Sequence, residues 1–162
     1  MQEESMITRD GFERLSEELE RLKGEGRRAV ADRLRRAAAS ESNLAENTEY
    51  LDAREEQARL ERRISRLAER LRFTQIVTPR LGNGRVDLGE RVRVRDVSSG
   101  RPLEVELVGP FEADLAAGRV SVASPLGRAL VGLREGEIAD VDAPCGRLGF
   151  EVLAVELPAR AP

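Results

Sequence analysis

The sequence predicts an α+β chain: an N-terminal antiparallel α-helical coiled-coil hairpin followed by a small, mostly antiparallel β domain. Apolar residues recur every three or four positions as far as Phe73, which is the spacing of an amphipathic helix. Beyond Phe73, glycine and proline separate short segments in which polar and apolar residues alternate, as in strands. Charged residues make up 35% and aromatic residues 3% of the chain, which favours an extended helical element beside a small core.

Two segments carry the helical pattern, residues 10–38 and residues 47–73. Their apolar stripes consist of Phe12, Leu15, Leu19, Leu22, Val30, Leu34 and Ala37 in the first, and Leu51, Leu60, Ile64, Leu67, Leu71 and Phe73 in the second. Thr8 or Asp10 is expected to cap the first helix, and Gly24 and Gly26 interrupt it. Because the link between the two segments is short, they are expected to fold back as a hairpin. The alternative from the pattern alone is half of a helical bundle.

The domain boundaries follow from the change of pattern. We expect the hairpin to occupy residues 1–76, with its tip at about residues 41–49, a linker at 77–83 and the β domain at 84–158. Strands are expected at residues 91–97 and in "LEVELVG", "GRVSVAS", "GEIADVDAP" and "LGFEVLAVEL". The segment "SPLGRALVG", residues 124–132, predicts a proline-led turn into a short helix. If that helix closes the core of the β domain, Leu126, Leu130 and Val131 are buried.

The composition excludes several classes of function. The chain has no histidine, the commonest general base and zinc ligand, and Cys145 is its only cysteine, so an intramolecular disulfide is impossible. A formal net charge of −3 argues against a general nucleic-acid binder. No apolar run reaches the length of a signal peptide or a membrane span, so we expect a cytoplasmic protein that does not bind a membrane.

Charge is sorted along the hairpin. Residues 41–56 contain the acids Glu41, Glu46, Glu49, Asp52, Glu55 and Glu56, with Arg54 as the only base. Residues 27–36 carry five arginines and one aspartate. The hairpin is therefore expected to have an acidic tip and a basic shaft behind it. A solvated helix with pairs such as Glu55–Arg59 explains individual charges equally well, but not their segregation.

An acidic tip on a narrow rod can enter a channel and add oxygen ligands to a metal ion that another enzyme holds. Mg²⁺ is often bound by one or two protein carboxylates together with substrate phosphates. Arginines behind the tip can contact a nucleic-acid backbone: we expect Arg27, Arg28, Arg33, Arg36, Arg54 and Arg59 to do so. The chain offers no catalytic cleft of its own, so it is expected to be an accessory factor, not an enzyme.

The tip "NLAENTEY" and the following "AREEQARLERRISRL" resemble the bacterial Gre transcript cleavage factors. So do "GNGRVDLGERVRV", "EADLAAGRVSVASPLGRALVGLREGE" and "GFEVLAVE", and the resemblance runs from about Met6 to Glu156. It implies a coiled coil that enters the secondary channel of RNA polymerase and an FKBP-like C-terminal domain that docks on the channel rim. Backtracked RNA is then cleaved at the active site of the polymerase. The partners implied are RNA polymerase and the 3′ end of the nascent RNA, and the factor is a monomer.

The resemblance also implies roles for particular residues. The family tip is G-D-L-x-E-N-A-E-Y, so Glu46 matches an acid that helps to hold a Mg²⁺ ion shared with the polymerase; the factor has no cofactor of its own. Asn43 replaces the other such acid and keeps an oxygen ligand without its charge. Glu41 is close enough in sequence to substitute. In the second domain, the residues expected to bind the polymerase are Ser124, Pro125, Leu126 and Arg128.

Three functions remain open from the sequence. The first is an elongation factor that stimulates cleavage of backtracked RNA. The second is a Gre-like channel binder with weak or no cleavage activity that modulates or inhibits transcription, because Asn43 replaces a metal-binding aspartate. The third is a coiled-coil adaptor or chaperone, which the sorted charge and the tip sequence disfavour.

Overall fold

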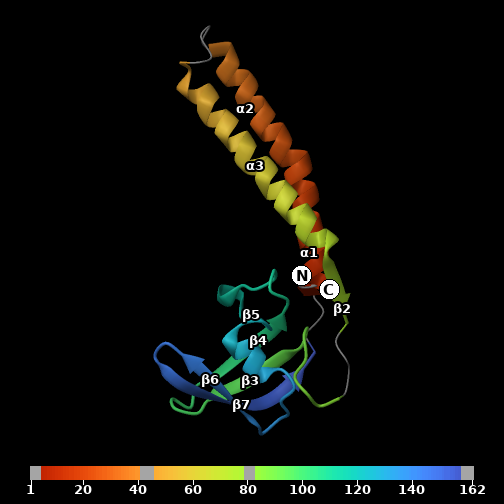
Figure 1. The fold of residues 1–162 in the computed structure, drawn as a ribbon, viewed down its shortest axis with the longest axis vertical. Helices are drawn as coiled ribbons and strands as arrows, with labels where there is room; N and C mark the ends of the chain where they lie inside the picture. Colours follow the sequence, from red (N-terminus) through yellow and green to blue (C-terminus); the bar gives the residue numbers. More distant parts are fainter. Residues whose placement is uncertain (1–4, 41–45, 79–82, 158–162) are drawn as a thin grey trace. The chain divides into compact units, whose positions relative to one another are not determined.

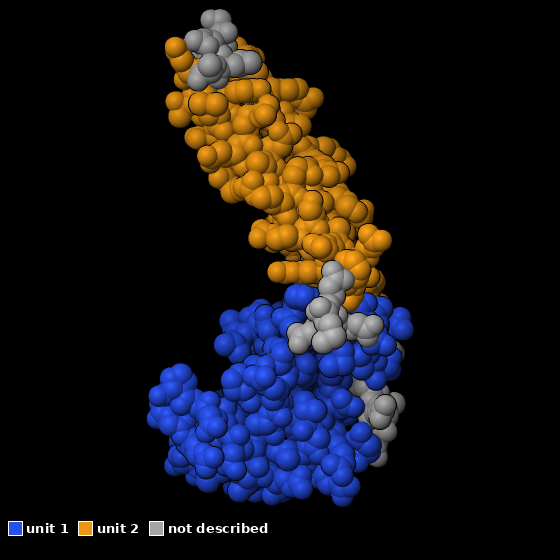
Figure 2. Space-filling model, in the orientation of Figure 1, with its two compact units in different colours: residues 1–11, 74–162 blue, residues 12–73 orange. Residues whose placement is uncertain are grey.

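The computed structural model describes residues 5–40, 46–78 and 83–157, and the chain divides into two compact units (Figures 1 and 2). One unit consists of residues 12–73 and is helical. The other consists of residues 1–11 and 74–162 and contains the β-strands. The predicted fold class, a helical hairpin followed by a mostly antiparallel β domain, is confirmed.

The helical unit is a pair of antiparallel arms joined at the tip (Figure 1). The first arm runs through helix α1 (Arg9–Arg21), a π-helical turn (Leu22–Gly26) and helix α2 (Arg27–Ser40). Helix α3 (Thr48–Arg72) forms the second arm. Both arms therefore lie where the apolar periodicity predicts a helix. Their common core is a narrow seam, in which Leu19, Leu22, Ile64 and Leu67 form one cluster of buried side chains.

The π-helical turn coincides with the two glycines that interrupt the sequence pattern. Buried Leu22 and buried Val30 lie eight positions apart, one more than the seven that return an α-helix to nearly the same face. A π-turn accommodates one extra residue, so both side chains still face α3. A Cβ atom added to Gly26 would lie 3.3 Å from Leu60 Cδ1, so the arms also approach closely at this point.

The larger sheet contains five strands in the order β5-β4-β3-β7-β6. The strands are β3 (Arg91–Asp96), β4 (Pro102–Val108), β5 (Arg119–Ser121), β6 (Ile138–Ala143) and β7 (Gly146–Glu156). Each corresponds to a strand expected from the sequence. Only β4 and β5 are parallel, and the register of β3 against β7 shifts between Arg93 and Val94, which marks a β-bulge.

One face of this sheet is buried and the other is charged. The core cluster on the buried face contains these strand residues: Val92, Val94, Val105, Leu107, Val120, Ala139, Val141, Phe150 and Val152. Helix α4 (Pro125–Leu130) contributes Leu130, which is fully buried, to the same cluster. On the other face Arg93 pairs with Glu156 at 3.0 Å and Arg91 with Glu104 at 3.2 Å. The alternation seen in the sequence is thus the alternation between core and solvent.

A small parallel sheet, which the sequence analysis did not predict, joins the segments on either side of the hairpin. Strand β1 (Ser5–Thr8) pairs with β2 (Thr74–Val77), and both belong to the β-containing unit. The hairpin boundary predicted at residue 76 thus falls inside β2. Each strand has only four residues, too few to show a period.

Strand β1 is fixed to the β domain through a buried carboxylate. Glu112, only 6% exposed, accepts hydrogen bonds from the backbone N–H groups of Thr8 and Gly109, at 2.8 and 2.9 Å, and from the Thr8 hydroxyl. Thr8 Oγ1 in turn accepts from Gly11 N at 3.0 Å, so Thr8 caps α1, as expected. Gly109 is necessary here because a Cβ atom would lie 1.9 Å from the Met6 carbonyl oxygen.

Candidate functional site at the tip of the hairpin

The described part of the tip centres on Asn47, which is buried between two exposed residues. Asn47 is 3% exposed, whereas Glu46 and Thr48 are exposed. Its Oδ1 accepts a hydrogen bond from Tyr50 N at 3.0 Å and so caps α3. Its Nδ2 donates to the Ala37 carbonyl at 2.8 Å, at the end of α2. The single side chain therefore connects the two arms where the chain reverses direction.

The acidic residues of the tip face solvent. Glu46 lies in a turn directly before Asn47, and Glu49 and Asp52 are exposed on the first turns of α3. Carboxylates near the N-terminus of a helix interact favourably with its dipole, which explains why acids are tolerated here. Glu41 and Asn43, the other two predicted tip residues, lie outside the described residues. Among those that are described, no cluster of three or more histidine, cysteine, aspartate or glutamate side chains could hold a metal ion.

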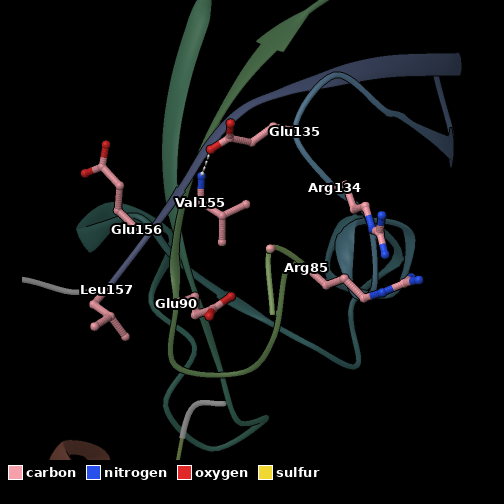
Figure 3. Close-up of a pocket in the computed structure, with 8 residues that line it drawn as sticks. Arg85, Glu90, Arg134, Glu135, Val155, Glu156 and Leu157 are labelled. Carbon is pink, nitrogen blue, oxygen red and sulfur yellow. Dashed lines mark hydrogen bonds between the residues drawn. The ribbon is translucent and has the colours of Figure 1, made fainter. Parts of the chain in front are cut away.

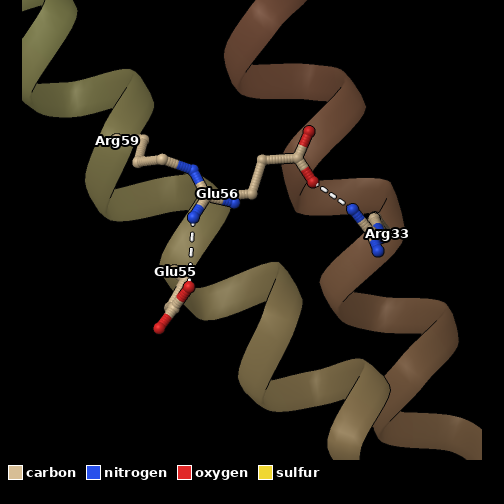
Figure 4. A network of polar contacts seen from close by, with 4 residues as sticks. All are labelled: Arg33, Glu55, Glu56 and Arg59. Carbon is tan, nitrogen blue, oxygen red and sulfur yellow. Dashed lines mark hydrogen bonds and ion pairs between the residues drawn. The ribbon is translucent and has the colours of Figure 1, made fainter.

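The arginines predicted to contact nucleic acid differ in the partners that they have in the structure. Three of them are engaged with carboxylates of α3: Arg27 with Glu61, Arg33 with Glu56, and Arg59 with Glu55. Figure 4 shows the last two pairs, with Glu56 directed across to α2 and Glu55 along its own helix. Arg36 Nε lies 3.4 Å from the Asp32 carbonyl oxygen. Arg28 and Arg54 make no ion pair with any residue that the structure describes.

The Arg27–Glu61 pair is the best-aligned contact between the arms. Arg27 Nε and Nη2 each donate to one carboxylate oxygen of Glu61 at 2.8 Å. The hydrogen bonds from Arg27 lower the pKa of Glu61, and those to Glu61 raise the pKa of Arg27. Such two-pronged pairing fixes direction as well as distance, so this contact helps to set the register of α2 against α3.

The residues predicted to bind the polymerase lie at the start of α4. Ser124 caps this helix: its Oγ accepts from Gly127 N at 3.0 Å and donates to the Ser121 carbonyl at 2.7 Å. Gly127 is packed tightly, since a Cβ atom would lie 2.0 Å from Ser121 O. Pro125 and Arg128 are exposed. The turn is thus held rigidly from within while part of its surface faces outward.

The same helix also closes the core, as the sequence suggested, with one correction. Leu130 is fully buried and Leu126 packs partly buried against the core cluster. Val131, which was expected to be buried, is 42% exposed. The reason is that α4 ends at Leu130 and Val131 adopts an extended conformation, with φ −55° and ψ 129°, so the helical spacing no longer applies to its side chain.

The β domain also contains an open pocket with a volume of about 580 Å³ (Figure 3). Its described lining consists of Gly84, Arg85, Glu90, Arg134, Glu135, Val155, Glu156 and Leu157. Burial raises the pKa of Glu90 above its usual value. Several other charges have partners already: Glu135 accepts from Val155 N at 3.2 Å, and Arg85 donates to the Gly132 carbonyl at 3.0 Å. No aromatic side chain is among these lining residues.

Sequence reasoning missed the role of Asn47, although a signal was available. Asparagine is one of the preferred residues immediately before a helix, and Asn47 precedes the periodic segment that begins the second arm. Its bond to Ala37 could not be found in this way, because that contact joins residues ten positions apart across the reversal. The buried Glu112 gave no signal, since its partner Thr8 lies 104 positions away.

Comparisons with known proteins cover nearly the whole chain. Residues 5–76 match the family model described as transcription elongation factor, N-terminal, and residues 81–157 the one described as transcription elongation factor, GreA/GreB, C-term. Transcription elongation factor GreA of Syntrophobacter fumaroxidans is 43% identical over 150 residues, which cover 92% of this chain and 96% of that protein. The GreA of Ralstonia nicotianae is 40% identical over 152 residues, covering 93% and 96%.

The chain was also compared with solved structures. GreA factor homolog 1 (Gfh1) of Thermus thermophilus is 34% identical, and the match covers 94% of this chain and 99% of that one, with a TM-score of 0.42.

Proposed function

Because the chain belongs to the GreA/GreB family of transcription elongation factors, we propose how it acts on transcription. It binds RNA polymerase, inserts the hairpin tip into the secondary channel and stimulates cleavage of backtracked RNA at the active site of the polymerase. The chemistry belongs to the polymerase, and the chain is an accessory factor that works in the cytoplasm as a monomer. Family membership favours this role over that of a coiled-coil adaptor.

One observation carries the proposal: the exposed carboxylate of Glu46 lies at the end of the hairpin, directly before Asn47, which joins the two arms. A carboxylate in this position can be delivered into a narrow channel without unfolding either arm. The neighbouring Asn47 is bonded to both arms, so the backbone next to Glu46 is held in place. Delivery of a pre-positioned group costs less entropy than ordering a flexible one.

The metal chemistry is shared with the polymerase. Glu46 offers one anionic ligand, which fits an ion held mainly by groups of the polymerase. A second Mg²⁺ held there would supply an activated water for phosphodiester hydrolysis. Asn43 supplies a neutral oxygen and Glu41 a further carboxylate, from the part of the tip outside the described residues.

The arginines contribute unequally to contact with the nascent RNA 3′ end. Arg28, Arg36 and Arg54 are the best candidates among the six, because none of them is paired with a described carboxylate. Arg27 and Arg33 pair with acids of α3 across the hairpin, and Arg59 pairs with Glu55 on its own helix, so all three must exchange a partner before they contact phosphate. Polymerase docking is assigned to Ser124, Pro125, Leu126 and Arg128 at the start of α4, where a capped turn presents exposed side chains.

The decisive experiment is transcript cleavage in stalled, backtracked elongation complexes. Glu46→Ala is expected to lower the cleavage rate at limiting Mg²⁺ by at least tenfold, since loss of even an outer-shell partner typically costs 10–100-fold in metal affinity. Glu49→Ala is the matched control, as it removes an exposed carboxylate from the first turn of α3. Unchanged cleavage with Glu46→Ala contradicts the assignment of the tip. Failure of the chain to retain core RNA polymerase in a pull-down points instead to the adaptor.

Asn43→Asp separates the cleavage factor from its main alternative, a channel binder with weak or no cleavage. If the neutral amide limits metal binding, the aspartate variant cleaves faster than the wild type at low Mg²⁺ and equally fast at saturating Mg²⁺. If the wild type binds polymerase and slows transcription, and only the Asn43→Asp variant stimulates cleavage, the protein is the inhibitor. A wild type already as fast as the variant at low Mg²⁺ shows that Asn43 is no handicap.

A further inference from the structure

Both polar groups of the Asn47 side-chain amide form hydrogen bonds at the tip. Oδ1 accepts from Tyr50 N at 3.0 Å, and Nδ2 donates to Ala37 O at 2.8 Å and lies 3.5 Å from Ser40 Oγ. The residue is 3% exposed although it lies at the end of the hairpin, where the neighbouring side chains are in solvent. Burial of an amide is unfavourable unless its groups are hydrogen-bonded, and here each of them is.

The two bonds satisfy helix ends that would otherwise lack partners. The last four carbonyls of α2 and the first four N–H groups of α3 have no partner within their own helix. Ala37 O belongs to the first set and Tyr50 N to the second. Asn47 bridges them, and Ser40 Oγ adds a second hydrogen bond to Ala37 O at 2.8 Å. The C-terminus of one arm and the N-terminus of the other are therefore held at a fixed separation.

We propose that Asn47 is a positioning residue for Glu46: it fixes the backbone from which that carboxylate projects, and so sets how well the tip completes the metal site of the polymerase. This inference rests on the proposed function. Glu46 is bonded directly to Asn47 in the backbone. Both polar groups of the Asn47 side chain are hydrogen-bonded, so the backbone next to Glu46 is held in place. A misplacement of about 1 Å at such a site can cost about 100-fold in rate.

Conservative substitutions separate positioning from simple helix capping. Asn47→Asp and Asn47→Ser both keep an oxygen that can cap α3, since aspartate and serine are favoured at this position. Neither retains the Nδ2 donor to Ala37 O. The two variants therefore preserve the start of α3 and break the bridge to α2. Because serine adds no charge, it controls for the negative charge that aspartate introduces.

The test combines cleavage with two measurements that do not depend on activity. Both variants are expected to raise the Mg²⁺ concentration for half-maximal cleavage about tenfold, with most of the rate recovered at saturating Mg²⁺. Polymerase affinity is expected to stay within about twofold of the wild type, because the docking residues are untouched. In the free protein, ¹⁵N relaxation is expected to show a lower order parameter for the Glu46 amide, while the Tyr50 amide remains as ordered as in the wild type.

The outcomes separate this inference from the function on which it rests. Wild-type Mg²⁺ dependence in both variants, with Glu46→Ala impaired, overturns the positioning role and leaves the proposed function intact. A loss of cleavage that follows reduced helix content, with no change in Mg²⁺ dependence, also overturns it, since that is the signature of a merely structural role. If neither the wild type nor Asn43→Asp stimulates cleavage, the proposed function fails and the positioning role fails with it.

Discussion

The helical hairpin and the β domain bury their apolar side chains in different ways. In the hairpin only a narrow seam is buried, and the arms are also joined by ion pairs such as Arg27–Glu61 and by the amide of Asn47 at the tip. In the β domain a two-dimensional core forms between the sheet and α4, with Leu107 and Leu130 fully buried. The difference shows that the hairpin can present most of its surface to a partner, whereas the β domain depends on a cluster of deeply buried side chains.

The largest effect is expected from a cavity in the core of the β domain. Leu130→Ala removes a fully buried side chain that joins α4 to the sheet, and such truncations cost about 2–5 kcal/mol. Hydrogen exchange followed by mass spectrometry should show faster exchange in residues 84–157 with little change in residues 12–40 and 46–73. Leu51→Ala, at a position that is 49% exposed on α3, is the control and should alter exchange very little. Equal loss of protection in both units contradicts this expectation.

A smaller effect, an increase in the free energy of unfolding, is expected at the π-helical turn. Gly24→Ala adds a methyl group that meets only the flexible end of Arg28, at 3.8 Å, and gains up to about 1 kcal/mol of helix propensity. Gly26→Ala gains the same propensity but lies 3.3 Å from Leu60 Cδ1, so a smaller or negative change in unfolding free energy is expected. Urea unfolding followed by circular dichroism measures both. If Gly24→Ala destabilises the hairpin, the glycine is required for the π-turn itself.

The smallest effect is expected from the ion pair between the arms. Because Arg27 lowers the pKa of folded Glu61, the pair stabilises the hairpin above the unfolded pKa of Glu61, and this stability is lost as pH falls through the lower, folded pKa. Glu61→Gln should therefore flatten the acid side of a plot of melting temperature against pH. Both partners are largely solvent-exposed, so added salt should shrink the difference between wild type and variant. A difference that is independent of salt contradicts a purely electrostatic origin.

The sequence was sufficient wherever structure follows from local spacing. Periods of 3.6 and 2 predicted α3 and the strands β3 to β7 to within three residues at each end, because burial of one face imposes the same repeat on sequence and structure. Thr8 was recognisable as a cap because its partner lies three residues away. The roles of Glu46 and the Ser124 turn, suggested by the resemblance of short motifs, stay predictions, and the structure shows Glu46 exposed and Ser124 capping α4.

Tertiary structure decided what depends on residues far apart along the chain. The β1–β2 pair, the burial of Glu112 against Thr8 and the bond from Asn47 to Ala37 each join segments that no local period relates. The same holds for the division of the arginines, since the sequence supplied their number but the register of α2 against α3 determined which ones meet a carboxylate. The spacing of apolar residues determines which face of a helix or strand is buried. Which side chains then meet depends on how the helices and strands pack against one another.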